Sequence, residues 1–216
     1  MRKLLLVALG VLALPTLALA QTQDCPSCVL GIFDGPNINN TTNCGTIGVG
    51  TPKDVYVGIR LSGTETGVTG LEFSIAGMDG LLLIGTEALT PAALTLGSPP
   101  APADTSATSI GTGGLNMAWA TCLSGSQQLI KLSLLSFGPQ ADKVLKVMHK
   151  FPPSNLNFNL KPVFSRCDGP TFTTVRTGTG CFVLNPSAPG GVPGCACYST
   201  PVEAKTWGAM KRLYQN

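Results

Sequence analysis

The chain has 216 residues, of which 14 are basic and 11 acidic, and charged residues make up only 12% of it. This share is well below the roughly 25% usual for globular proteins. The formal net charge of +3 is too small to predict a nucleic-acid-binding surface. With 26 glycines and 17 prolines, a chain of this length is expected to form one domain that is rich in turns.

Residues 1–20 have the features of a signal peptide. An almost wholly apolar run follows Arg2 and Lys3, and Ala18-Leu19-Ala20 places small residues where a signal peptidase recognises them. We expect cleavage before Gln21, which leaves 12 of the 14 basic side chains against 11 acidic ones. An uncleaved anchor is the alternative, but the apolar run is shorter than the ~20 residues of a membrane-spanning helix. The mature chain is therefore expected to have no transmembrane segment and to be secreted, or held in the periplasm or at the surface of a bacterium.

The cysteines predict disulfides. All eight lie after the expected cleavage site: Cys25, Cys28, Cys44, Cys122, Cys167, Cys181, Cys195 and Cys197. An even number behind an export signal is typical of disulfide-bonded domains, although the sequence does not choose the pairing. Two alternatives are a redox motif at Cys25-Pro26-Ser27-Cys28 and a four-thiolate zinc site made of Cys25, Cys28, Cys195 and Cys197. An oxidising compartment favours disulfides over both.

Alternating apolar and polar residues predict strands along most of the mature chain. The clearest are Asp54–Leu61 and Leu71–Ala76, each expected to pack one face on a core and to expose the other. Further strands are predicted at Val29–Phe33, Leu81–Ile84 (as a buried strand), Leu115–Cys122, Leu129–Phe137, Lys143–Lys150, Pro162–Ser165, Thr171–Arg176 and Cys181–Leu184. Residues 141–148 would also fit a short helix, but the valines favour a strand.

These strands predict the fold class. About eight to ten short strands separated by frequent turns indicate an all-β, antiparallel two-sheet sandwich of the cohesin-like or immunoglobulin-like kind over residues 21–198. The proline-rich stretch 86–108 is expected to be a long loop with a short strand at Ala92–Leu96, and a domain linker is the alternative. Trp119 is expected to anchor the core.

The tail at residues 199–216 has a different pattern and predicts a short C-terminal helix. Its apolar side chains recur at helical spacing, and a basic residue near its end suits the helix dipole. The residues that could serve in docking or sorting are Trp207, Met210, Lys211, Leu213 and Tyr214. The helix either covers a sheet edge or acts as a sorting or docking signal.

Sequence motifs predict no catalytic residue, cofactor or metal ligand. His149 is the sole histidine and is expected on the surface of its strand, with no partner acid in its own segment. The carboxylates form no paired motif, and no serine lies in a Gly-x-Ser-x-Gly elbow. The glycine-rich stretches lack the lysine and the helix of a phosphate-binding loop.

Several segments resemble known exported proteins. Asp54–Ala76 is similar to the opening hairpin of cohesin-like sandwiches, and Leu115–Cys122 and Leu129–Leu135 resemble later strands of such domains. The segment Cys167–Thr173 and the tail, which ends in a Thr-Trp-Gly-x-x-Lys-x-x-Tyr motif, resemble parts of uncharacterised secreted bacterial proteins. The resemblance implies a cohesin-like fold in an exported protein and assigns no catalytic residue.

Three functions follow as hypotheses. The first is a non-enzymatic adhesion or scaffold module that docks a protein partner at the cell surface on one face of a sheet. The second is a carbohydrate-binding module, because several aromatic side chains could stack on the sugar rings of a glycan: Trp119, Trp207, Tyr56, Tyr198 and Tyr214. The third is a secreted hydrolase. The sequence does not identify the ligand.

Overall fold

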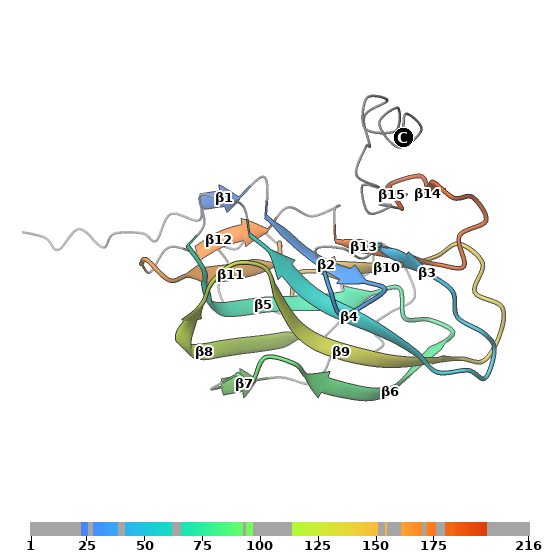
Figure 1. The fold of residues 1–216 in the computed structure, drawn as a ribbon, viewed down its shortest axis with the longest axis horizontal. Helices are drawn as coiled ribbons and strands as arrows, with labels where there is room; N and C mark the ends of the chain where they lie inside the picture. The colour runs from blue at the N-terminus through green and yellow to red at the C-terminus, as the bar shows by residue number, and fades with distance from the viewer. Residues whose placement is uncertain are drawn as a thin grey trace, which may run out of the picture.

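The computed structural model describes residues 23–25, 28–38, 42–61, 66–92, 94–96, 114–150, 154, 161–169, 172–175 and 180–197. Every regular element in these ranges is a strand, and the strands form two facing sheets and one small hairpin (Figure 1). The predicted all-β sandwich is therefore confirmed for the described part of the chain. The predicted signal peptide at 1–20 and the tail at 199–216, with its predicted helix, lie outside that part.

The smaller sheet has four antiparallel strands in the order β2, β4, β9, β6. Their bounds are β2 Val29–Phe33, β4 Lys53–Arg60, β6 Leu81–Ala88 and β9 Gln127–Ser136. Residues 55, 57 and 59 of β4 are fully buried, as the alternation predicts for the face that meets the core.

The larger sheet has nine strands organised around β5. One edge of β5 pairs with β8, which pairs in turn with β7, and the other edge pairs first with β11 and then with β10. Beyond these strands lie β12 and β1 on one branch, and β13 and β3 on the other. The bounds are β1 Gln23–Cys25, β3 Cys44–Gly45, β5 Val68–Ala76, β7 Leu94–Leu96, β8 Leu115–Leu123, β10 Lys143–Met148, β11 Val163–Arg166, β12 Phe172–Val175 and β13 Cys181–Leu184.

The core fills the space between the two sheets. Ile59 of β4, Phe73 and Ile75 of β5 and Leu134 of β9 are all at most 1% exposed. Trp119 of β8 is also buried, so its predicted role as a core anchor is confirmed. Removal of these apolar side chains from water is the main force that holds the sheets together.

The first pair of predicted strands is not a hairpin. Residues 54–60 belong to β4 of the smaller sheet, whereas residues 71–76 belong to β5 of the larger one. The two strands face each other across the core instead of pairing. A period of two determines which face of a strand is buried, but it does not determine the neighbouring strand, so the sequence pattern fitted both arrangements.

Three polar side chains and one strand differ from their predicted exposure. Glu72, Ser74 and His149 were expected to face water, but they are only 6–7% exposed. Ser74 Oγ donates a hydrogen bond to the His149 carbonyl at 2.6 Å, within a part of the sheet that other segments cover. The predicted buried strand at residues 81–84 is instead an edge strand, β6, with Leu82 and Ile84 about half exposed.

All eight cysteines form disulfides, which overturns the zinc alternative. The pairs are Cys25–Cys28, Cys44–Cys197, Cys122–Cys167 and Cys181–Cys195. Two of these bridges tie the end of the described chain, with the hairpin of β14 (Gly191–Val192) and β15 (Cys195–Ala196), to β3 and β13. Asn43 is buried between them and donates to the Cys181 and Ala196 carbonyls at 3.1 and 2.9 Å.

Candidate functional site

A groove of about 390 Å³ lies on the outer face of the larger sheet. Four adjacent strands form it, and their register places the lining side chains in two rows across the sheet. The first row is Leu94, Ala118, Gly70 and Ser165, and the second is Leu96, Asn116, Glu72 and Val163. The small residues in the middle of the first row leave a hollow, because little side-chain volume rises from the sheet there.

Glu72 lies on the floor of this groove and is 6% exposed. Its carboxylate accepts hydrogen bonds from the Ser154 backbone N–H at 3.0 and 3.3 Å. In the amide orientation that satisfies both neighbours, Asn116 donates to Glu72 Oε2 at 3.1 Å and accepts from the Ser154 hydroxyl at 2.9 Å. The carboxylate is therefore held by neutral donors in one orientation.

The rim of the groove is apolar on the side of β7. Leu94 and Leu96 are 52% and 53% exposed, although leucine is usually buried. They stand on the edge strand of the larger sheet, next to β8. An acid on the floor and leucines on the rim offer one charged and two apolar contacts to a single occupant.

Among the residues that the structure describes, Glu72 forms no ion pair. The ion pairs between these residues are Lys53–Asp34, Lys131–Glu87, Lys143–Asp79 and Arg166–Asp168. A carboxylate that is removed from water without a cation loses hydration that neutral hydrogen bonds replace only in part. The groove therefore favours an occupant that brings positive charge.

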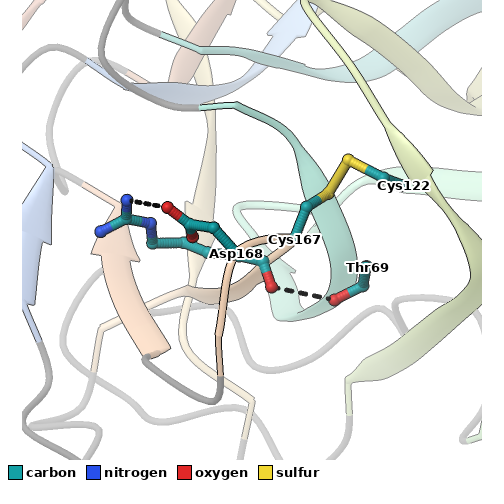
Figure 2. Close-up of polar contacts among 5 residues, drawn as sticks. Thr69, Cys122, Cys167 and Asp168 are labelled. Carbon is teal, nitrogen blue, oxygen red and sulfur yellow. Dashed lines mark hydrogen bonds and ion pairs between the residues drawn. A yellow bond between two sulfur atoms is a disulfide. The ribbon is translucent and has the colours of Figure 1, made fainter.

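A disulfide fixes one end of the groove (Figure 2). Cys122 belongs to β8 and Cys167 follows β11, and these two strands pair with opposite edges of β5. The bridge thus crosses the chain at Gly67, directly before β5, where any Cβ would collide with both sulfur atoms. It links β8 to the segment that follows β11, and these two strands lie on either side of β5.

Polar contacts hold the same end of the groove. Thr69 of β5 donates its hydroxyl to the Arg166 carbonyl at 3.3 Å. The Arg166 guanidinium contacts Asp168 Oδ2 at 2.6 Å, next to the disulfide (Figure 2). The Thr69 bond joins β5 to β11, whereas the Arg166–Asp168 contact holds the turn that carries Cys167.

The predicted site residues fall into two groups. The eight cysteines are brought together in pairs, as described above, whereas the tail residues 207, 210, 211, 213 and 214 lie outside the described chain. Trp119 is buried in the core and cannot serve as a sugar platform. Cys28 is fully buried in its bridge with Cys25, which excludes the surface position that a redox motif requires.

The sequence did not identify Glu72 as part of a site. Glutamate in an alternating strand is the ordinary pattern of a solvent-facing position. The unusual environment of Glu72 depends on Asn116 and Val163, its partners in the register, and on Ser154. The one local signal was the pair of small residues, Gly70 and Ser74, that flank it on the same face.

The described residues hold no further candidate of two other kinds, a metal site or a membrane-spanning helix. No group of three or more histidine, cysteine, aspartate or glutamate side chains in the described part of the chain could hold a metal ion. Within the same residues, no helix is long and apolar enough to cross a membrane.

Comparison with known proteins gives a likeness to cohesin modules. No protein family and no curated protein matches the chain by sequence. A cohesin module from the family 33 glycoside hydrolase of Clostridium perfringens aligns with a TM-score of 0.45 and 11% identity, over 74% of this chain and 96% of that one. A non-cellulosomal cohesin from Archaeoglobus fulgidus aligns with a TM-score of 0.42 and 11% identity, over 73% and 90%.

A third solved structure is the sixth cohesin from scaffoldin B of Acetivibrio cellulolyticus, in complex with a Cel5 dockerin mutant. It aligns with a TM-score of 0.42 and 15% identity, over 74% of this chain and 99% of that one. The likeness is to all-β modules of the class that the sequence resembles. At these values it assigns no partner, site or activity to this chain.

Proposed function

We propose that the chain is an exported, non-enzymatic binding or scaffold module whose protein partner docks in the groove on the larger sheet. The single observation that carries the proposal is the buried Glu72 carboxylate, which lies on the floor of a groove with an apolar rim on the β7 side and has no cation among the described ion pairs. The occupant is an extended protein segment that places a lysine or arginine over Glu72 and apolar side chains against Leu94 and Leu96.

Charge complementarity favours a basic protein segment as the occupant of the groove. A cationic side chain would form a charge-assisted hydrogen bond with Glu72, which is stronger than a bond between neutral groups. Burial of the half-exposed Leu94 and Leu96 would add apolar stabilisation. An extended segment suits the site, because its side chains alternate with a spacing close to that of the rows across the groove.

The proposed compartment is outside the cytoplasm. The predicted signal peptide at 1–20 would direct export, and four disulfides suit an oxidising environment. The folded domain is proposed to cover residues 21–198. The tail at 199–216 would serve as a sorting or docking signal or as a helix that covers a sheet edge.

The proposal is tested with a random library of displayed twelve-residue peptides, selected on the mature chain. Enriched peptides are expected to carry lysine or arginine between apolar residues. Their affinity should fall at least about tenfold for Glu72→Gln, because truncation of one partner of a buried charge pair costs roughly 2–5 kcal/mol. The matched control is Glu87→Gln, which removes an acid from the smaller sheet and should leave binding unchanged.

Two results would overturn the proposal. One is enrichment of peptides without a basic residue. The other is equal binding of the selected peptides by the wild-type chain and by Glu72→Gln. A charge reversal, Glu72→Lys, sharpens the test, since it should shift the selected peptides from basic to acidic ones.

A further inference from the structure

A second cavity, of about 260 Å³, lies at one end of the smaller sheet, away from the groove. It is formed by Asn37 and Ile38 of the segment that follows β2, by the residues that follow β6, and by the beginning of β9. The lining residues are Asn37, Ile38, Leu89, Thr90, Ser126, Gln127 and Gln128. The volume is slightly below the ~300–1,000 Å³ of most ligand pockets, which suits a ligand of about one sugar ring.

The floor of this cavity depends on a glycine and an irregular strand. Ile38 packs directly on Gly58 of β4, where an added Cβ would lie 2.9 Å from the Ile38 side chain and 2.9 Å from the Gln127 carbonyl oxygen. The register between β4 and β9 shifts at this point, so that Gly58 pairs with Gln128 while Leu129 has no partner on β4. Such bulges re-aim side chains, and this one places Gln128 beside Gly58.

The wall on the side of β6 is held by three hydrogen bonds. The Leu89 N–H donates to the Leu129 carbonyl at 2.9 Å, and the Thr90 hydroxyl donates to the Gln128 carbonyl at 2.5 Å. Trp119, which is buried in the core, donates its indole N–H to the Thr90 carbonyl at 3.4 Å. These bonds attach this wall of the cavity to β9 and to the core residue Trp119.

The described residues of the lining carry polar groups but no charged side chain. The side-chain amide of Gln128 and the hydroxyl of Ser126 have no hydrogen-bond partner among the described residues. Gln127 donates its amide N–H to the Ser124 carbonyl at 2.5 Å, which leaves its amide oxygen as an acceptor. The groups that face the cavity are thus neutral donors and neutral acceptors in close proximity.

We propose that this cavity binds one neutral sugar residue of a glycan. A sugar hydroxyl is both a donor and an acceptor, so a ring with several hydroxyls can satisfy the Gln128 amide, the Ser126 hydroxyl and the Gln127 amide oxygen together. The partly exposed side chain of Leu89, with Ile38 beneath the floor at 3% exposure, supplies the apolar part of the lining for the carbon atoms of the ring. A charged ligand is disfavoured, because none of the lining side chains can compensate a charge on burial.

The test uses the mature chain and methyl glycosides of glucose, galactose, mannose and N-acetylglucosamine, with binding followed by saturation-transfer NMR and titration calorimetry. At least one glycoside is expected to bind, with an affinity that stays constant between about pH 5 and 8 because no lining side chain titrates in that range. Gln128→Ala is expected to weaken that binding by at least about fivefold through loss of hydrogen bonds. Ser126→Ala should weaken it by a smaller factor.

Glu72→Gln, in the groove of the other sheet, is the matched control and should bind the glycoside like the wild type. This control separates the two proposals, since each variant should affect one ligand only. The proposal is overturned if no glycoside of the panel binds, or if Gln128→Ala and Ser126→Ala both bind with wild-type affinity. Loss of glycoside binding in Glu72→Gln would place the sugar in the groove and would overturn it as well.

Discussion

The carboxylates on the outer faces of the two sheets differ in their burial and in their hydrogen-bonding and ion-pair partners. On the smaller sheet, Glu87 of β6 forms an ion pair with Lys131 of β9, and Asp54 of β4 accepts a hydrogen bond from the Ser133 hydroxyl at 2.5 Å. On the larger sheet, Glu72 is more deeply buried than Glu87, yet only neutral groups bind it. Glu72, whose burial costs more free energy than that of Glu87, is therefore the carboxylate that has no cation among the described ion pairs.

This difference indicates where a partner is needed. Exposed ion pairs contribute little to stability, so the smaller sheet gains solubility and little else from Glu87 and Lys131. A buried carboxylate with neutral partners lowers stability relative to a well-packed apolar residue. Proteins keep such costly groups mainly where binding or chemistry uses them, which is the basis for assigning a function to Glu72.

The largest effect is expected from the disulfide at the end of the groove. Cys122 and Cys167 close a loop with a sequence separation of 45, whereas Cys25 and Cys28 are separated by 3. In the chain-entropy account, Cys122→Ser/Cys167→Ser should lower the free energy of unfolding by about 4 kcal/mol. Cys25→Ser/Cys28→Ser is the control and should cost less than half of that, as measured by chemical denaturation.

The same two disulfide variants also show whether the Cys122–Cys167 bridge supports binding in the groove on the larger sheet but not binding at the smaller sheet. Loss of the Cys122–Cys167 bridge should also weaken peptide binding in the groove, because β8 and β11 are then no longer linked across β5. Sugar binding at the end of the smaller sheet should persist at temperatures where the variant is folded. Equal losses of stability for the two disulfide variants would contradict the chain-entropy explanation.

A smaller effect is expected from the exposed leucines on the two edge strands. Leu96→Ala on β7 should weaken the selected basic peptide about threefold to tenfold, since burial of a leucine side chain contributes roughly 1.5–3 kcal/mol and Leu96 is already half buried. Leu82→Ala on β6 is the matched control, because Leu82 has a similar exposure but lies on the other sheet. Calorimetric titration of both variants with one peptide provides the measurement, and equal losses would place the peptide outside the groove.

The sequence predicted which faces are buried much better than which strands are neighbours. Val57 of β4 and Met117 of β8 are buried as their alternation indicates, because each strand carries that information locally. The sheet that contains β4 could not be predicted, since the choice depends on contacts with β2 and β9 far along the chain. The disulfide pairing was open for the same reason.

The groove and the sugar site were harder to predict than the fold. Glu72 gains its environment from Asn116 and Ser154, which lie 44 and 82 positions further along the sequence. Gln128 faces the second cavity because of a bulge at Leu129, and a single extra residue in a strand leaves no clear mark on an alternating pattern. Both sites depend on register, which hydrophobic periodicity constrains only within one strand pair.

The smallest effect concerns the ion pair on the smaller sheet. Glu87 accepts a hydrogen bond from the Lys131 ammonium and raises the pKa of that group above its ordinary 10.5, and the charge of Glu87 acts in the same direction. The stabilisation from the pair is therefore complete below the unfolded pKa, which is near the ordinary 10.5, and it is lost as the pH rises through the folded pKa. Glu87→Gln should lower the pKa of Lys131 in an NMR titration, and its small difference in stability from the wild type should be constant between about pH 6 and 9 and should vanish above the folded pKa. An unchanged pKa in this variant would show that Glu87 does not compensate Lys131, and the contrast between the two faces would then rest on burial alone.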